Sequence, residues 1–124
     1  MIKNKQVPTI LIVEDDADVR DVIALTLSME GFQVLVAESR EDAISILDIK
    51  SPSIIILDWF MPGMPVEAFV SKVNDEHPKT TILMISASMK LAEKATQLGL
   101  KYYLSKPFEV ADLLSIAQTC ATSS

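Results

Sequence analysis

The stretch TILIVEDD, residues 9–16, places five mostly apolar residues directly before three acids. A run of this kind, rich in β-branched residues, is typical of a strand that is covered on both faces, as in a parallel sheet. Four more runs follow the same pattern: QVLVA at 33–37, IIIL at 54–57, TILMI at 81–85 and YYL at 102–104. The sequence therefore predicts five short, buried strands.

Segments with helical spacing follow each of these strands. Apolar residues that recur three and four positions apart mark one face of a helix. Ser39 with Asp42 resembles a capping pair, and Gly31 and Gly99 stand where helices end. The expected faces are Val19, Val22, Ile23 and Thr26; Ala43, Ile44 and Leu47; Val66, Phe69, Val70 and Val73; Leu91, Ala92, Ala95 and Leu98; and Leu113, Ile116, Ala117 and Cys120.

Five alternations of strand and helix predict an α/β fold, a doubly wound (βα)5 sandwich around a five-stranded parallel sheet with right-handed crossovers. The 124 residues suit one domain, expected at 9–121, with an N-terminal extension at 1–8 and a tail at 122–124. No output domain is expected within these residues.

Composition excludes several classes of protein. One Cys and one His are too few for a disulfide or zinc scaffold. With 11 basic and 17 acidic side chains the net charge is 11 − 17 = −6, which argues against direct binding to nucleic acid. No apolar run approaches the ~20 residues that span a bilayer. We therefore expect a cytoplasmic protein with no membrane partner.

Polar and charged residues follow four of the five predicted strands. Glu14 and Asp15 follow the first strand, Asp58 the third, Ser86 the fourth and Lys106 the fifth. In open parallel sheets, ligands bind outside the carboxyl ends of the strands. The predicted fold therefore brings these side chains together at one edge.

The chemistry of this set points to a metal ion and a phosphoryl group. Three converging carboxylates repel one another, so a compensating cation is expected. Oxygen ligands suit Mg²⁺ or Mn²⁺, whereas zinc is disfavoured by the lack of Cys and His. Lys106 can balance a further negative charge, and Ser86 can donate to an anionic oxygen. A carboxylate in such a site can also act as a nucleophile toward phosphorus and form an aspartyl phosphate.

Four motifs resemble those of the receiver domain of two-component response regulators, of the chemotaxis-regulator type. They are IVEDD at 12–16, LDWFMPG at 57–63, MISA at 84–87 and LSKPF at 104–108. Each motif alone is weak, but in this order and at these spacings they are specific. The likeness covers essentially the whole chain and implies a flavodoxin-like topology with strand order 2-1-3-4-5.

The resemblance implies a role for each acid. Asp58 would receive a phosphoryl group from a phosphohistidine on a sensor kinase or phosphotransfer protein. Glu14, Asp15, Asp58 and the backbone carbonyl of Phe60 would hold Mg²⁺, Glu14 partly through water. The chain would then be a signalling phosphoacceptor, limited to self-phosphotransfer and slow autodephosphorylation rather than acting as an enzyme on other substrates.

The resemblance also implies a switch. Ser86 and Lys106 would contact the phosphoryl oxygens, and Tyr103 matches the aromatic position whose ring moves when the Ser86 hydroxyl is drawn to the phosphate. The fourth helix, fifth strand and fifth helix would carry the readout to a downstream protein or output domain, or to a second copy. The sequence leaves open the cognate kinase, the output, and whether the domain stands alone or belongs to a DNA-binding regulator or hybrid kinase.

The sequence departs from the family pattern in two places, and each departure leads to an expectation about structure or function. Where the family usually has Asp-Gly before its third helix, this chain has Pro65-Val66, so we expect a shifted helix start. Phe60 and Ser88 occupy positions where the family uses polar groups to place water against the phosphoryl group. We therefore expect Phe60 to shield the acyl phosphate and slow its hydrolysis.

Two other functions fit the sequence less well. A phosphatase of the haloacid-dehalogenase type uses an acid two residues after its nucleophile, and Phe60 stands there. A flavin- or nucleotide-binding module needs a phosphate loop rich in Gly, Ser or Thr after the first strand. The acids at 14–16 would repel that phosphate.

Overall fold

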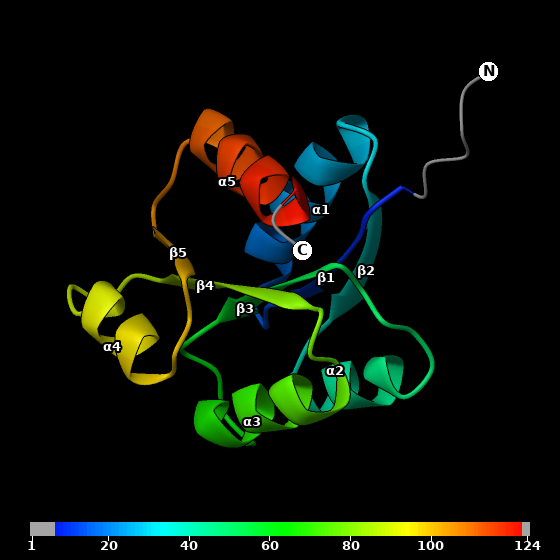
Figure 1. Ribbon diagram of the computed structural model, residues 1–124. Coiled ribbons are helices and arrows are strands. Elements are labelled where there is room, and N and C mark those ends of the chain that lie inside the picture. Colours follow the sequence, from blue (N-terminus) through cyan, green and yellow to red (C-terminus); the bar gives the residue numbers. More distant parts are fainter. Residues whose placement is uncertain (1–6, 123–124) are drawn as a thin grey trace.

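The computed structural model describes residues 7–122, in which five strands alternate with five helices (Figure 1). The strands are β1 (Thr9–Val13), β2 (Gln33–Ala37), β3 (Ile54–Asp58), β4 (Thr81–Ser86) and β5 (Tyr102–Ser105). The helices are α1 (Ala17–Met29), α2 (Arg40–Leu47), α3 (Val66–Glu76), α4 (Leu91–Gln97) and α5 (Val110–Thr122). All strand pairs are parallel and the order is β2-β1-β3-β4-β5, as predicted.

The domain limits given above are only partly within the described residues. Residues 1–6 of the expected extension and 123–124 of the expected tail lie outside them. Helix α5 includes Thr122, so it ends one residue later than expected, a difference common at helix ends. None of the helices within 7–122 is long and apolar enough to cross a membrane.

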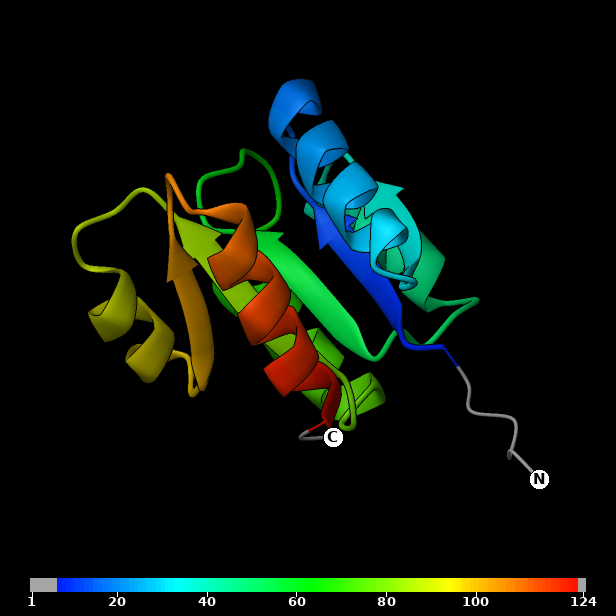
Figure 2. The same cartoon turned by 90° about the horizontal axis from the view of Figure 1, so that it is seen from above.

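The sheet has helices on both faces (Figures 1 and 2). Successive side chains of a strand point to opposite faces. Ile10 and Ile12 of β1 accordingly pack in a cluster with residues of α1 and α5, whereas Leu11 and Val13 pack with residues of α2, α3 and α4. The central strands thus form a layer between two apolar cores.

Burial differs between the central and the edge strands. Strands β1, β3 and β4 are almost wholly buried, as expected. The edge strands β2 and β5 are only half buried, with Val36 and Tyr103 exposed, so the expectation of cover on both faces was wrong for them. An edge strand has a neighbouring strand on one side only.

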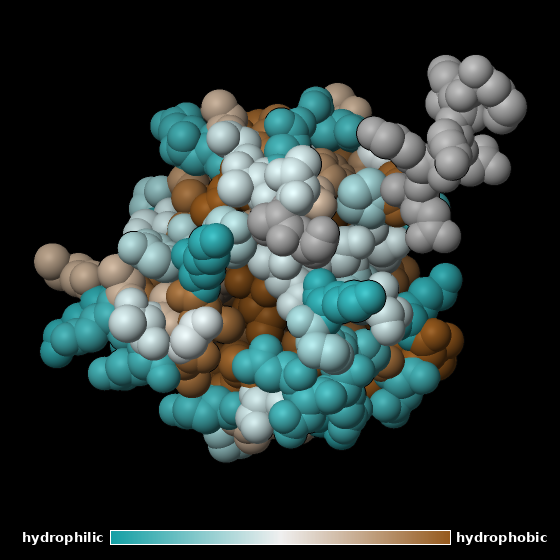
Figure 3. Space-filling view, viewed as in Figure 1, coloured by the Kyte–Doolittle hydropathy of each residue, from teal (hydrophilic) through white to brown (hydrophobic). Residues whose placement is uncertain are grey.

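On the face shown in Figure 3, hydrophilic residues cover the outer sides of the helices and hydrophobic residues show between them.

The helix faces and caps follow the sequence with two exceptions. All four apolar residues predicted for α3 are buried, and α3 begins at Val66, directly after Pro65. Val22 and Ala92 are exposed, so the faces predicted for α1 and α4 were wrong at these positions. Helix α1 buries Ile23, as predicted, and also Leu27, which was not predicted. Stripes three and four residues apart overlap on a helix, so spacing alone did not fix the rotation of these helices.

The caps expected at the junctions are present. The Ser39 hydroxyl accepts a hydrogen bond from the Asp42 backbone N–H at 3.0 Å, and Asp16 caps α1 by accepting from two backbone N–H groups. Gly31 and Gly99 have φ of +96° and +73°, the left-handed conformation that ends a helix.

Two leucines of α1 test which face of this helix supports the fold. Leu27 is fully buried and Leu25 is exposed. Leu27→Ala should lower the free energy of unfolding by about 2–5 kcal/mol through lost burial and a cavity. Leu25→Ala, the matched control, should change it by less than about 0.5 kcal/mol. Urea unfolding measures both, and equal losses would contradict the orientation of α1.

Candidate functional site

The sheet register sets two acids side by side at the carboxyl edge. The loops that leave this edge lie together at one end of the molecule (Figure 2). Val13 of β1 pairs with Leu57 of β3. Glu14 and Asp58 are the next residues along the two chains, so they lie at the same level.

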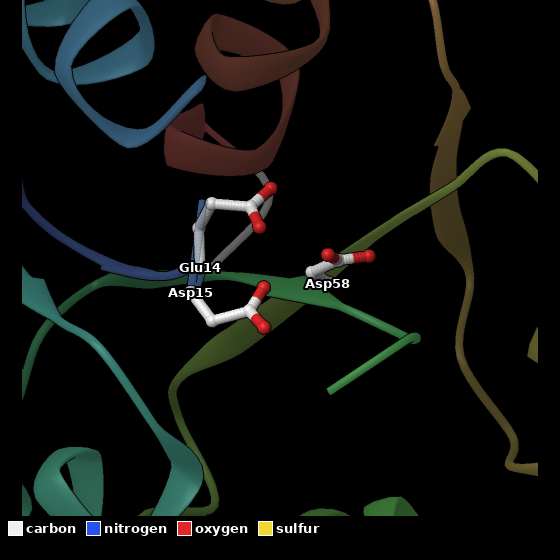
Figure 4. A group of neighbouring side chains, drawn as sticks. All are labelled: Glu14, Asp15 and Asp58. Atoms are coloured by element: carbon white, nitrogen blue, oxygen red, sulfur yellow. The ribbon is translucent and has the colours of Figure 1, made fainter. Parts of the chain in front are cut away.

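Glu14, Asp15 and Asp58 form an acid cluster. One carboxylate oxygen of each lies within 4.8 Å of the others, and Glu14 and Asp15 turn their carboxyl groups toward Asp58 (Figure 4). Glu14 and Asp58 are buried, with 0% and 4% of their surface exposed, whereas Asp15 is exposed. Burial raises the pKa of Glu14, and the neighbouring Lys106 only partly opposes this. The sequence prediction that three acids converge here is confirmed.

Lys106 bridges the two buried acids. Its Nζ donates to Glu14 Oε1 at 2.7 Å and to Asp58 Oδ2 at 3.2 Å. Burial lowers the pKa of Lys106, but its contacts with the two carboxylates outweigh this and raise the pKa overall. The Lys106 backbone N–H also donates to the Ser86 carbonyl at 2.8 Å. Lys106 is thus held at both its backbone and its ammonium group.

Ser86 ends β4 and is fully buried. Its hydroxyl oxygen accepts a hydrogen bond from the Ser88 backbone N–H at 3.0 Å. No residue between 7 and 122 accepts the hydroxyl proton of Ser86. That proton is therefore available to an anionic oxygen placed at the strand ends.

The acid cluster fits a hard divalent cation. The three carboxylates and the Lys106 ammonium carry a formal charge of 1 − 3 = −2. The donor set is all oxygen, as Mg²⁺ requires. Ligands of one octahedral Mg²⁺ lie about 3 Å apart when adjacent and about 4.2 Å apart when opposite, so these oxygens, within 4.8 Å of one another, would draw closer on binding.

Aromatic side chains flank the cluster. The Phe60 backbone N–H donates to Asp58 Oδ1 at 3.3 Å, while the Phe60 side chain is 55% exposed. The Lys94 ammonium of α4 lies 4.5 Å from the Trp59 ring centroid and 5.0 Å from that of Phe60. Such cation–π contacts link α4 to the segment that follows Asp58.

Tyr103 lies on β5, beside Met84 of β4. Its side chain is 41% exposed, and it makes no hydrogen bond to Ser86 in the part of the chain that the structure describes. The structure thus places Tyr103 two residues away from the level of Ser86, on the neighbouring strand, with its ring open to solvent.

Two arginines beside the site were missed by the sequence analysis. Arg20 of α1 donates to the Glu14 carbonyl at 2.9 Å, and Arg40 of α2 donates to the carbonyls of Asp58 and Trp59 at 3.3 and 2.6 Å. Arg40 did carry a signal in the sequence: it follows the Ser39 cap, so its positive charge stands at a helix N-terminus, where the helix dipole disfavours it. Such a conflict with local preference is typical of residues that serve the tertiary structure.

Relatives of the chain are signalling proteins. The phosphate regulon transcriptional regulatory protein PhoB of Pseudomonas aeruginosa is 31% identical over 111 residues, which are 86% of this chain and 48% of that protein. The response regulator protein FleR of the same species is 31% identical over 109 residues, 86% of this chain and 23% of FleR. The chain thus spans about half the length of PhoB and about a quarter of FleR.

Solved structures superpose closely on this chain. The chemotaxis response regulator CheY4 of Vibrio cholerae superposes with a TM-score of 0.84 at 26% identity, covering 93% of this chain and 99% of CheY4. NtrX of Brucella abortus superposes with a TM-score of 0.88 at 26% identity, covering 95% of this chain and 28% of NtrX. The family profile "Response regulator receiver domain" matches residues 10–118. The chain therefore belongs to the response regulator receiver domain family.

Proposed function

We propose that Asp58 of this receiver domain accepts a phosphoryl group from a phosphohistidine on a sensor kinase or phosphotransfer protein. The observation that carries the proposal is the bridge from Lys106 to Asp58 and Glu14 inside the acid cluster. A buried carboxylate held by an ammonium group beside further acids is equipped for phosphoryl transfer, in which positioning and charge compensation supply most of the catalysis.

The reaction would form one bond and break one. An oxygen of the Asp58 carboxylate attacks phosphorus, the bond from phosphorus to the imidazole nitrogen breaks, and that nitrogen keeps the electron pair. The product is an acyl phosphate on Asp58 and, because the departing ring carries one proton on its other nitrogen or takes one from water, a neutral histidine on the donor. The buried Ser86 hydroxyl and the Lys106 ammonium would hold the oxygens of the transferred group.

The acids would hold Mg²⁺ during this step. Carboxylates of Glu14, Asp15 and Asp58 and the Phe60 carbonyl are the proposed ligands, Glu14 partly through water. The ion would neutralise charge on the phosphoryl oxygens. Binding of a cation would also relieve the repulsion among the three acids.

The phosphodonor has room to approach beside Lys106. An open, largely apolar hollow of about 450 Å³ lies there, lined by Val19 and Val22 of α1 and by Pro107 and Phe108. A donor helix of apolar character would fit against this surface. The exposed Val22, which does not pack in the core, is then explained as a contact for the donor.

Phosphorylation would be read on the α4, β5 and α5 side of the domain. The Ser86 hydroxyl would turn to the phosphoryl group, and the exposed ring of Tyr103 would move inward on the neighbouring strand. The cation–π contact of Lys94 with Trp59 and Phe60 ties α4 to the segment that follows Asp58. A downstream protein, an output domain or a second copy would bind the changed surface.

Intact mass after incubation with Mg²⁺ and a small acyl phosphate donor tests the proposal. The wild type should gain about 80 Da, the mass of one phosphoryl group, in a form that alkali releases. Asp58→Asn should gain none, because the amide is not a nucleophile. Asp21→Asn is the matched control, since this acid of α1 lies outside the cluster, and it should react like the wild type. An equal gain in Asp58→Asn would overturn the assignment.

The lifetime of the phosphoryl group tests the role of Phe60. Phe60→Asn places a polar group where it can orient water toward the acyl phosphate, and it should speed decay by about tenfold. Phe60→Leu keeps an apolar side chain and should decay at a rate close to that of the wild type. Loss of the phosphorylated mass over time measures both rates. Decay of Phe60→Asn at the wild-type rate would show that Phe60 does not shield the site.

A further inference from the structure

Arg40 is a buried charge with no ion-pair partner. Only 2% of its surface is exposed, and no carboxylate oxygen within residues 7–122 lies within 4.0 Å of it. Burial of a charge is costly unless hydrogen bonds compensate for the lost water. The partners of Arg40 therefore show what the fold gains by burying it.

The guanidinium group of Arg40 donates hydrogen bonds to four backbone carbonyls. Nη1 donates to Met64 at 2.8 Å and Met61 at 3.2 Å, and Nη2 donates to Trp59 at 2.6 Å and Asp58 at 3.3 Å. Arginine can do this because its donors form a rigid planar fork. Arg40 thus joins the end of β3 to the loop that leads into α3.

This loop has little other support. Residues 59–65 belong to no helix or strand, and Pro65 provides no side-chain cap for α3. No backbone N–H in the described part of the chain donates to the carbonyls of Trp59, Met61 or Met64. For these three carbonyls, Arg40 takes the place of a backbone partner.

Glu41, the next residue of α2, holds the same loop from its N–H side. Its carboxylate accepts from the Met64 backbone N–H at 2.8 Å. Gly63 has a φ of +97°, and a Cβ atom there would lie 2.7 and 2.9 Å from the two Glu41 carboxylate oxygens. Gly63 therefore permits both the turn and the close approach of Glu41.

The pattern of acceptors singles out one carbonyl. Of the four carbonyls from Asp58 to Met61, three accept from Arg40, and the Phe60 carbonyl does not. We propose that Arg40 is a positioning residue, which fixes the backbone on both sides of Phe60 and leaves that carbonyl to bind the cation held by the acid cluster. The proposal rests on the proposed function of this cluster as a Mg²⁺ site.

The charge of Arg40 alone predicts the opposite effect. A fixed positive charge near the acids disfavours a second cation, so removing it would tighten Mg²⁺ binding. Loss of positioning would weaken Mg²⁺ binding instead. The sign of the change in affinity separates the two explanations.

Calorimetric titration of metal-free protein with Mg²⁺ measures this sign. Arg40→Met removes the charge and the donors, and Arg40→Lys keeps the charge but loses the fork. Both should weaken Mg²⁺ binding by about tenfold or more, as substitutions behind a metal site do. Lys72→Met, which also removes one positive charge but from an exposed pair with Glu76, should stay within about twofold of the wild type. If Arg40→Met does not fold, the Mg²⁺ affinity of Arg40→Lys alone decides between loss of positioning and loss of charge.

Hydrogen exchange without metal provides a second readout. The Met64 amide should exchange faster in both Arg40 variants than in the wild type, and at the wild-type rate in Lys72→Met. Unchanged exchange, or Mg²⁺ affinity equal to or tighter than wild type, overturns the positioning role while leaving the proposed function intact. Absence of Mg²⁺ binding in the wild type would instead overturn the metal site itself, and the positioning role with it.

Discussion

Repulsion among the carboxylates of Glu14, Asp15 and Asp58 is the constraint around which this structure is organised. Carboxylates about 5 Å apart repel by a few kcal/mol at an effective dielectric of about 20, and by less where one is exposed, as Asp15 is. The register of β1 and β3 fixes Glu14 and Asp58 at the same level, so their backbones cannot move apart without breaking the sheet. The fold therefore maintains a site that favours a cation.

The basic groups around the cluster differ in what they hold. Lys106 contacts two of the acids directly and is anchored by its backbone to Ser86. Arg20 forms an ion pair with Glu38 at 3.7 Å, outside the cluster. Toward the cluster, Arg20 and Arg40 contact only backbone carbonyls, so neither neutralises Glu14, Asp15 or Asp58 at contact distance. Compensation by Lys106 is therefore incomplete, and the remaining negative charge is what a divalent cation would neutralise.

The sequence was sufficient to predict the fold and to predict that the acids, Ser86 and Lys106 lie at one edge of the sheet. Both predictions depend on local patterns of the sequence. Apolar runs indicate buried strands. A residue that directly follows a parallel strand lies at the carboxyl edge of the sheet. The orientation of α1 and the role of Arg40 could not be predicted in this way. Val22 fits the helical period as well as Leu27 does, and Arg40 binds carbonyls 18 to 24 residues away, whose positions depend on the finished loop.

The stability of Asp58→Asn against that of the wild type, with and without Mg²⁺, tests the central claim most directly. In chelator, urea unfolding should show the variant to be more stable by about 1 kcal/mol, because one of three repelling charges is gone. At Mg²⁺ a hundred times its dissociation constant, the wild type should gain about 2.7 kcal/mol and become the more stable of the two. A wild type that is more stable in chelator, with an equal Mg²⁺ gain in both proteins, would contradict the account.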